Sequence, residues 1–548
     1  MRVNVLGHLN VNWDEFYYLS QVFDHDRGGL TLRLQTFHVH FFGWLARVSG
    51  NEVDQIVAAR AVMLGLQAVA CVALYRIARR LTGANAALFA VAAYLAMSCG
   101  VRSGASFRSD PLAICLIMCA LDLLLAPDRS ARRLVTAGLL FATAGMVTIK
   151  VAIFLPSVAL ILIGPHLLRL SDRTSRPALI TGLTTVLGFT FLHWVHAATL
   201  NQQGVRHSVE VARLSFSKML AEAHLFPQLE VLTATLRWDM AFWACLLGGC
   251  GLVIQRIRHT SGRERLRWVE AAALVLPLGS LALYRNSYPY FYPFLLAPAS
   301  VVTALAWEAL ARAAGPGAPR LLLKGLKTIV LTWFVASLML HGLLLPRVMP
   351  LAHQREVVAV IHRMFPAPVP YLDRSSMIGS FPQVGFFMTT WGIESYNRRG
   401  QPILQQAIQE KQPPLLIANH PFLDIAGAVY PPGGSIQPGL LESDRKALER
   451  AYVHYWGPIY VAGVRLDAEP GATARPFDVA LGGRYQLEAD GPVQIDGEML
   501  RPGESVSLRV GGHRITEMGT IGSVTLHWAS VGERPKAPAP ALPVFLGH

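Results

Sequence analysis

Long apolar runs, separated by short loops, fill most of the first 350 residues and limit what this chain can fold into. About ten can be placed, at residues 57–75, 84–101, 110–126, 133–149, 151–168, 178–198, 239–256, 268–284, 289–311 and 326–346. Several reach the roughly 18 residues that indicate a transmembrane helix. Only 15% of the 548 residues are charged, against about 25% in soluble domains, and the mean hydropathy is +0.37. The sequence predicts a polytopic α-helical membrane protein.

Basic residues mark every second loop between these runs. They cluster at residues 76–80, 129–133, 169–176, 255–267 and 312–327. Cytoplasmic loops of membrane proteins carry such an excess of Lys and Arg. We therefore expect these loops to face the cytoplasm, and residues 1–56, 200–237 and the tail from about 347 to lie outside. The topology also accounts for the net charge of +14, so no nucleic-acid partner is indicated.

The N-terminal segment, residues 1–56, shows no signal peptide and no apolar helix ahead of its acidic pair. Because the topology puts this segment outside the cytoplasm, we expect a first transmembrane helix to precede the motif. That would bring the number of spans from about ten to about eleven. The six cysteines all lie in apolar runs. Since no His or acidic cluster joins them, they indicate packing residues rather than a metal site.

The tail, residues 347–548, is expected to form a soluble extracytoplasmic α+β or β-sandwich domain. The segment "LLESDRKALERAYVHYW" predicts a helix, and alternating segments such as "ESVSLRVG" predict a β-rich part from about residue 475. "NHPFLD" resembles the His–Asp pair of glycerolipid acyltransferases, but three residues rather than four separate His420 from Asp424. We expect a loop there.

Acids, cations and aromatic side chains gather on the predicted outer face. "NVNWDEFYYL" carries an acidic pair, "FRSDPLA" opens a later span, and "TIK" lies between two spans. A carboxylate can take a proton from a hydroxyl, Arg and Lys can bind a leaving phosphate, and aromatic rings can stack on a sugar. The pattern predicts transfer of a phosphate-linked group. The candidate catalytic residues are Asp14 and Glu15, and the candidate substrate-binding residues are Arg108, Asp110, Lys150, Arg285, Tyr288 and His193.

Each candidate also has a structural explanation. Arg108 and Asp110 could pair at a helix start, where Asp110 could cap the helix ahead of Pro111. Lys150 could extend from a turn to the membrane interface. His193 and the tyrosines could be interface residues, and the acidic pair could be a solvated loop. Their shared side of the membrane is what favours a functional site.

The order of "WDEFYYL", "FRSDPLA" and "TIK" resembles the GT-C membrane glycosyltransferases, in particular the branch of the protein O-mannosyltransferases and the lipid A aminoarabinose transferases. The resemblance covers residues 10–346. It implies a GT-C-like helical bundle, with Asp14 as the catalytic base or acceptor-positioning residue and Glu15 beside it. Lys150 would meet the donor phosphate, and Asp110 would be the acid of the later loop. The donor would be a polyprenyl-phosphate sugar.

The sequence thus predicts a glycosyltransferase that moves a sugar from a polyprenyl-phosphate donor to a lipid, glycan or protein acceptor outside the cytoplasm. Residue usage favours a bacterial inner membrane with a periplasmic tail. Asp14, Glu15 and Asp110 offer oxygen ligands for a divalent metal, but the resemblance favours a reaction with no metal and no cofactor. Two alternatives stay open. A transporter or lipid flippase would need ionisable residues in mid-span, and a scaffold would use the tail to bind envelope partners.

Overall fold

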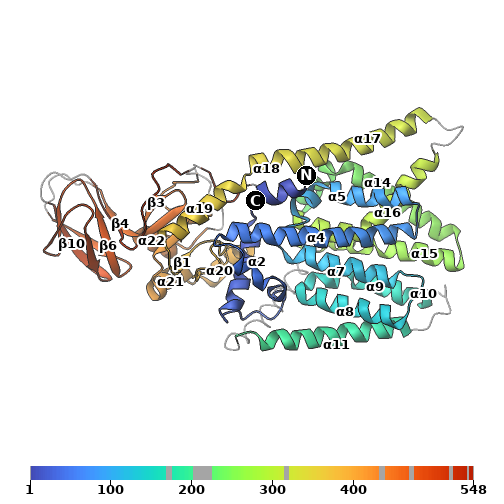
Figure 1. Cartoon of the computed structure of the whole chain (residues 1–548), viewed down its shortest axis with the longest axis horizontal. Helices are drawn as coiled ribbons and strands as arrows, with labels where there is room; N and C mark the ends of the chain where they lie inside the picture. The colour runs from blue at the N-terminus through green and yellow to red at the C-terminus, as the bar shows by residue number, and fades with distance from the viewer. Residues whose placement is uncertain are drawn as a thin grey trace. The chain divides into compact units, whose positions relative to one another are not determined.

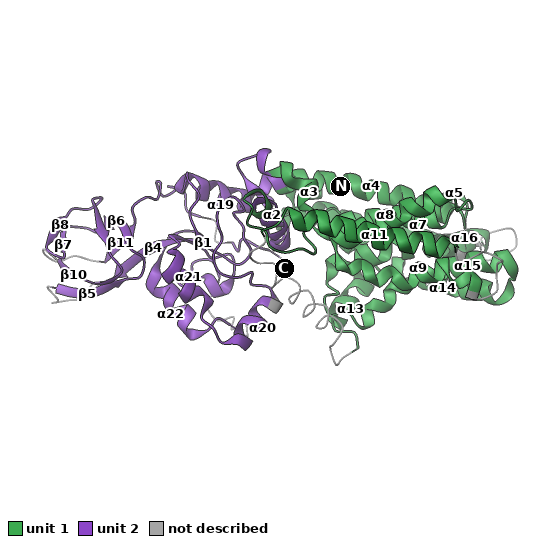
Figure 2. Ribbon diagram, turned by 90° about the horizontal axis from the view of Figure 1, so that it is seen from below, with its two compact units in different colours: residues 1–9, 24–45, 56–349 green, residues 10–23, 46–55, 350–548 purple. Residues whose placement is uncertain are grey.

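The computed structural model describes residues 2–167, 176–201, 225–313, 320–430, 439–467, 474–517, 523–539 and 542–546. Within them the chain divides into two compact units (Figure 2). Unit 1 comprises residues 1–9, 24–45 and 56–349, and unit 2 comprises residues 10–23, 46–55 and 350–548. Part of the predicted first loop is therefore grouped with the tail.

The described residues of unit 1 form helices joined by loops, as the apolar runs predict (Figure 1). Its helices are α1 (Arg2–His8), α3 (Val39–Phe42), η1 (Gly43–Arg47), α4 (Glu52–Arg79), α5 (Ala84–Ala96), α6 (Ser98–Ser103), α7 (Ser109–Leu124), α8 (Ala131–Val147), η2 (Ile149–Phe154), α9 (Leu155–Leu162), α10 (Gly164–Leu167), α11 (Arg176–Ala198), α13 (Leu229–Trp238), α14 (Met240–His259), α15 (Gly262–Ala273), η4 (Leu276–Ala282), η5 (Pro289–Phe291), α16 (Tyr292–Ala313), α17 (Arg320–Met339), η6 (Leu340–Leu344) and α18 (Leu345–Val348). Two of these helices cross a boundary between the units along the sequence. Residues 46–47 of η1 and residues 52–55 of α4 belong to unit 2.

Six helical stretches among the described residues are long and apolar enough to cross a membrane. They are Glu52–Arg79, Ile149–His166, Arg176–Ala198, Met240–His259, Pro289–Ala313 and Lys324–Val348. The predicted helical membrane fold is confirmed, but the structure has fewer long spans than the roughly ten apolar runs. The run at 84–101 is broken at Met97, because the Asp239 carboxylate accepts hydrogen bonds from the backbone N–H (2.8 Å) and hydroxyl (2.6 Å) of Ser98 and starts a new helix there.

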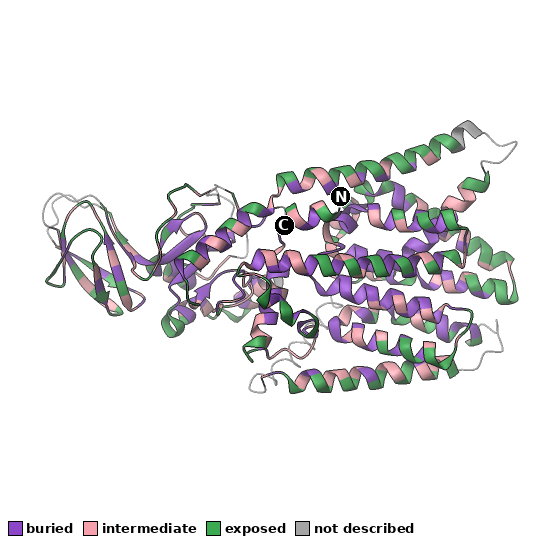
Figure 3. Cartoon of the chain, in the orientation of Figure 1, coloured by how far each residue is buried: buried purple, intermediate pink, exposed green. Residues whose placement is uncertain are grey.

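Small residues let the helices of unit 1 approach closely. α8 packs between α7 and α11, and the three lie side by side in Figure 1. At Gly138 of α8, a Cβ atom would collide with Thr184 of α11, and at Gly249 of α14 it would collide with the backbone of Val302 in α16. Such small-residue contacts are typical of helix packing in membranes. α11 and α17 expose much apolar surface (Figure 3), as lipid-facing helices do.

Unit 2 combines helices with two β-sheets. Its elements are α2 (Trp13–Asp26, of which residues 13–23 belong to this unit), α19 (Leu351–Met364), β1 (Tyr371–Leu372), α20 (Thr390–Arg399), α21 (Ile403–Lys411), β2 (Leu415–Ile417), η7 (Pro421–Leu423), α22 (Glu442–Ala451), β3 (Tyr452–Trp456), β4 (Ile459–Leu466), β5 (Ala474–Val479), β6 (Gly483–Glu488), β7 (Val493–Ile495), β8 (Glu498–Leu500), β9 (Ser505–Leu508), β10 (Gly511–Glu517) and β11 (Val524–Trp528).

The larger sheet has the strand order β1-β2-β4-β11-β6-β9, with β3 paired to β4, and the smaller sheet has the order β5-β10-β7-β8. Among the strands that the structure describes, β1 and β2 are the one parallel pair. Strands of both sheets contribute to one core cluster, including Phe477, Tyr485, Ile515 and Leu526. A second core, with Leu372, Leu404 and Tyr460, joins the helices α20 to α22 to the larger sheet.

Two details of the tail differ from the sequence prediction. The predicted helix "LLESDRKALERAYVHYW" ends at Ala451, and its aromatic end forms β3 instead. Strands also begin well before residue 475, since β1, β2, β3 and β4 all precede it. Aromatic residues favour strands when their alternate faces are buried, and β3 finds an antiparallel partner in β4 only in the folded chain.

Candidate functional site

Asp110 is the centre of a buried ionic cluster in unit 1. It lies in the first turn of α7, and its Oδ1 accepts a hydrogen bond from Nζ of Lys150 at 2.7 Å. Its Oδ2 lies 3.6 Å from Nε of Arg108. The side chains of all three residues are at most 10% exposed. Since buried charges must be paired, one carboxylate holds two cations close together.

The local sequence explains how this cluster forms. α8 ends at Val147, Thr148 is extended, and Ile149 and Lys150 begin the 3-10 helix η2, so the predicted "TIK" turn joins α8 to η2. That turn brings Lys150 to the start of α7. The pairing of Arg108 with Asp110, which the sequence left open as a structural explanation, is present. Asp110 also adds a negative charge to the positive end of the α7 dipole.

An aromatic ring covers the two cations. The guanidinium carbon of Arg108 lies 3.6 Å from the ring centre of Tyr290, and Nζ of Lys150 lies 5.0 Å from it. Tyr290 belongs to the "YRNSYPY" loop, in which the sequence singled out Tyr288 and Arg285. Both Arg285 and Tyr288 are half-buried, and the ring of Tyr288 lies 6.1 Å from that of Tyr290. Cation–π contacts of this kind hold cations in place without neutralising them.

His193, the last predicted substrate-binding residue, is half-buried in α11 and its ring stacks on that of Phe189. The more strongly bonded histidine of this helix is His196. Its Nδ1 shares a hydrogen bond with Nε2 of His40 at 2.8 Å, and its Nε2 shares one with the Thr36 hydroxyl at 2.9 Å. These contacts connect α11 to the segment around α3.

In unit 2, Asp14 and Glu15 begin α2. The side chain of Asn12 accepts a hydrogen bond from the backbone N–H of Asp14 at 2.8 Å, and Oε2 of Glu15 accepts one from the backbone N–H of Asn12 at 3.0 Å. This reciprocal pair is a capping box. Glu15 is buried, whereas Asp14 is half-buried. The capping box thus fixes the direction of the helix start on which Asp14 stands.

An arginine of the tail accompanies the acidic pair within unit 2. The guanidinium carbon of Arg374 lies 3.1 Å from the ring centre of Trp13. Burial lowers the pKa of Arg374 to about 9, while the charges of Tyr430 and Asp14 act in the opposite direction. Arg374 therefore stays a cation at neutral pH. The sequence around Arg374 did not indicate its contact with Trp13, because Trp13 lies some 360 residues earlier in the chain.

The loop that carries Arg374 is rigidly bonded. The carboxylate of Asp373, fully buried, accepts hydrogen bonds from the backbone N–H groups of Ser375, Ser376 and Met377 and from the Asn419 amide. Burial raises the pKa of Asp373 to about 6 in spite of these bonds. The carbonyl oxygen of the Asn419 side chain in turn accepts from the backbone N–H of Arg374 at 2.9 Å. A buried network of this kind sets one conformation for the loop.

The segment "NHPFLD" was expected to be a loop, but its central residues Pro421–Leu423 form the short helix η7. Nδ1 of His420 accepts a hydrogen bond from the backbone N–H of Phe422 at 3.2 Å. Asp424 accepts bonds from the backbone of Ala428, Val429 and Tyr430. Each side chain thus has its own structural role. Within the described residues, no group of three or more His, Cys, Asp and Glu side chains could hold a metal ion.

Comparison with known proteins gives the class. Residues 38–194 match the sequence profile of the dolichyl-phosphate-mannose-protein mannosyltransferase family. That range contains Arg108, Asp110 and Lys150. No sequence among the curated proteins matches the chain significantly.

Among solved structures, the oligosaccharyltransferase of Archaeoglobus fulgidus is similar with a TM-score of 0.51 and 9% identity, over 98% of this chain and 95% of that one. ArnT from Cupriavidus metallidurans, bound to undecaprenyl phosphate, is similar with a TM-score of 0.48 and 15% identity, over 78% of this chain and 92% of that one. The arabinosyltransferase EmbB from Mycobacterium smegmatis is similar with a TM-score of 0.39 and 10% identity, over 97% of this chain and 64% of that one.

The resemblance to the GT-C membrane glycosyltransferases is therefore confirmed. The chain is an integral membrane protein whose residues 38–194 resemble this family in sequence and whose fold resembles that of the Archaeoglobus fulgidus oligosaccharyltransferase.

Proposed function

We propose that this protein transfers a sugar from a polyprenyl-phosphate donor to a hydroxyl of a lipid, glycan or protein acceptor on the outer face of the membrane. The observation that carries the proposal is the buried Arg108–Asp110–Lys150 cluster of unit 1, which lies within the range that matches the mannosyltransferase family. Two adjacent cations under an aromatic ring suit a phosphate that gains charge as it leaves.

In the proposed reaction, Asp14 takes the proton of the acceptor hydroxyl, whose oxygen attacks the anomeric carbon of the sugar. The bond between that carbon and the phosphate oxygen breaks, and the electron pair leaves with the polyprenyl phosphate. The leaving phosphate thereby gains one negative charge. Arg108 and Lys150 stabilise that charge, with Arg285 as a further candidate, and Asp14 then loses its proton to water.

The other candidate residues have supporting roles in this proposal. Glu15 positions Asp14 through the capping box. Asp110 holds the two cations, and Tyr288 and His193 line the approach of the substrate. The first loop and the tail would face the periplasm of a bacterium, in agreement with the alternation of basic loops. The proposed reaction uses no metal and no cofactor.

The Asp14→Asn variant tests the proposal most directly. The full chain is reconstituted in liposomes with a polyprenyl-phosphate sugar and a candidate acceptor, and sugar transfer is measured. A general base contributes about 10²- to 10⁴-fold to the rate, so we expect transfer to fall at least about 100-fold. Asp26→Asn is the matched control, because Asp26 lies at the exposed end of the same helix.

Two outcomes would contradict the proposal. Unchanged transfer by Asp14→Asn would remove Asp14 from the mechanism. Flux of a lipid or solute across the liposome membrane, with no transfer from any donor, would instead identify a transporter.

A further inference from the structure

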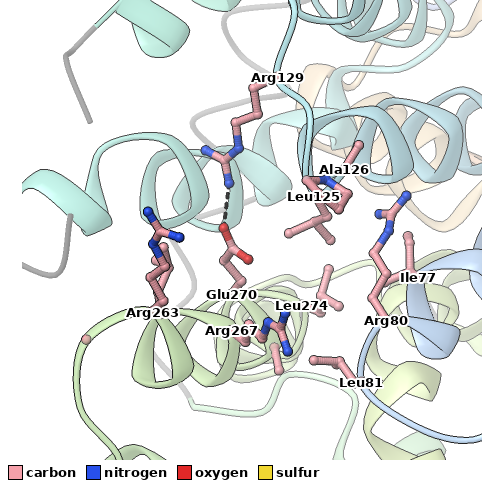
Figure 4. A pocket seen from close by; sticks show the side chains of 14 residues that line it. Ile77, Arg80, Leu81, Leu125, Ala126, Arg129, Arg263, Arg267, Glu270 and Leu274 are labelled. Carbon is pink, nitrogen blue, oxygen red and sulfur yellow. Dashed lines mark hydrogen bonds and ion pairs between the residues drawn. The ribbon is translucent and has the colours of Figure 1, made fainter. Parts of the chain in front are cut away.

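A charged cavity opens in unit 1, lined by residues of α4 and α15 and of the segments that follow α4, α7 and α15 (Figure 4). Its volume is about 930 Å³. Four arginines and one acid line it, namely Arg80, Arg129, Arg263, Arg267 and Glu270. The four arginines belong to basic loops that the predicted topology assigns to the cytoplasm. Asp110 begins the 16-residue helix α7, whereas Leu125 and Ala126 of the cavity follow its end. About 24 Å of helix therefore separates the cavity from the ionic cluster.

The charges of this cavity favour an anion. Nη2 of Arg129 pairs with Oε1 of Glu270 at 2.5 Å, and Nη2 of Arg80 pairs at 2.5 Å with Asp122, which does not line the cavity. Within the described part of the chain, Arg263 and Arg267 form no ion pair, and Nη1 of Arg80 is buried without a hydrogen-bond partner. A phosphate oxygen would satisfy that donor.

The helix α15 presents these arginines along one face. Arg263, Arg267, Glu270 and Leu274 follow one another at intervals of three or four residues, which places them on the same side of the helix. Gly262, the first residue of the helix, also lines the cavity. The positive end of the α15 dipole adds to the attraction for an anion.

The cavity also has an apolar wall. Ile77, Leu81, Leu125, Ala126 and Leu266 line it beside the arginines. A soluble phosphate would leave this wall in contact with water, whereas a lipid could cover it with the start of its acyl chains. Basic pockets between transmembrane helices on the cytoplasmic side are suited to anionic lipid headgroups.

We propose that this cavity binds the headgroup phosphate of an anionic membrane phospholipid, held by Arg80, Arg263 and Arg267, with its acyl chains on the apolar wall. The site is independent of the transfer reaction and needs no residue of the ionic cluster around Asp110. Its occupant anchors α15 to the ends of α4 and α7.

Native mass spectrometry of the full chain tests this proposal. The protein is held in neutral detergent micelles that contain phosphatidylglycerol, phosphatidylcholine or inorganic phosphate alone, and the retained adducts are counted. We expect one retained phosphatidylglycerol, weaker retention of phosphatidylcholine and no retained phosphate. The double variant R263Q/R267Q should bind phosphatidylglycerol about tenfold more weakly, because each basic residue contributes to the attraction of an anionic headgroup.

R258Q/R265Q is the matched control. It removes the same charge from exposed positions of α14 and α15 that do not line the cavity, so its retention of phosphatidylglycerol should equal that of the wild type. Equal loss in both double variants would overturn the proposal, as would equal retention of both lipids. Retention of inorganic phosphate alone, displaced by neither lipid, would show a site for a soluble anion instead. Melting curves of both variants, expected to match the wild type because the replaced side chains are exposed, confirm that they are folded.

Discussion

At the scale of single residues, burial decides which groups carry charge in unit 2. Arg374 keeps its proton at neutral pH, while the buried His420 beside it is neutral. Burial, together with the charge of Arg374, lowers the pKa of His420 to about 3. The hydrogen bond that Nδ1 of His420 accepts also requires an unprotonated nitrogen.

The lowered pKa of His420 makes the stability of the segment from β2 to η7 depend on pH. The unfolded segment binds a proton at His420 below a pKa of about 6.5, but the folded segment does so only near 3. The contribution of His420 to stability therefore falls as the pH drops from 6.5 toward 3, by about 2 kcal/mol between pH 6.5 and 5. Hydrogen exchange of residues 415–423 in the full chain, corrected for intrinsic rates, measures it. His420→Asn should remove this contribution, whereas the titration of Asp373, with a pKa of about 6, remains in both chains. An equal pH dependence in the wild type and the variant would contradict the assignment.

At the scale of elements, the two acids in the first turn of α2, Asp14 and Glu15, have different surroundings. Glu15 bonds the backbone of Asn12, and Asn12 bonds the backbone of Asp14. The alternative that the acidic pair is a solvated loop does not fit Glu15, because Glu15 is buried at the start of a helix. The positions of the two acids in the helix therefore differ, although they are adjacent in sequence.

Two variants of Glu15 test that difference. Glu15→Gln keeps an oxygen that can accept the bond from Asn12, so we expect sugar transfer within about twofold of the wild type. Glu15→Ala removes the cap and should cost about 1 kcal/mol of local stability, seen as faster hydrogen exchange over residues 12–18, with lower transfer. A loss of about 100-fold in Glu15→Gln would instead identify Glu15 as the base.

At the scale of the whole molecule, the tail and part of the first loop form one unit. The amide of Gln354 in α19 bonds the backbone N–H and C=O of Val11 at 2.6 and 2.8 Å, and the C=O of Val544 at 3.0 Å. Tyr17 stacks on Phe387 at 4.2 Å between ring centres. The acidic pair thus depends on residues far along the chain for its support.

Gln354→Ala should show this dependence. It leaves buried backbone groups of Val11 without a partner, which costs about 1–3 kcal/mol for each group. We expect faster hydrogen exchange over residues 10–16 and slower sugar transfer, although Gln354 itself takes no part in the chemistry. Gln406→Ala is the control, since Gln406 is exposed on α21 of the same unit. Exchange that is unchanged in Gln354→Ala would mean that the tail does not support the segment.

The sequence alone determined the helical membrane class, the approximate positions of the apolar helical segments and the family resemblance. It did so because hydropathy is a local property, and each apolar run reports its own helix without knowledge of any other. It also assigned Arg108, Asp110 and Lys150 to one side of the membrane, because two apolar runs separate the segments that carry them. The local sequence pattern gave a wrong prediction where an element depends on a partner. The residues of β3 were predicted to be helical, but they form a strand that pairs with β4.

Only the tertiary structure decided which distant residues meet. In the folded chain the ring of Tyr290 covers Arg108 and Lys150, and His196 of α11 hydrogen-bonds to His40. Arg374 stacks on the ring of Trp13. The tertiary structure also grouped residues 10–23 with the tail rather than with the helices that follow them. The physical reason is that these contacts depend on packing between segments hundreds of residues apart, and no local window of the sequence contains both partners.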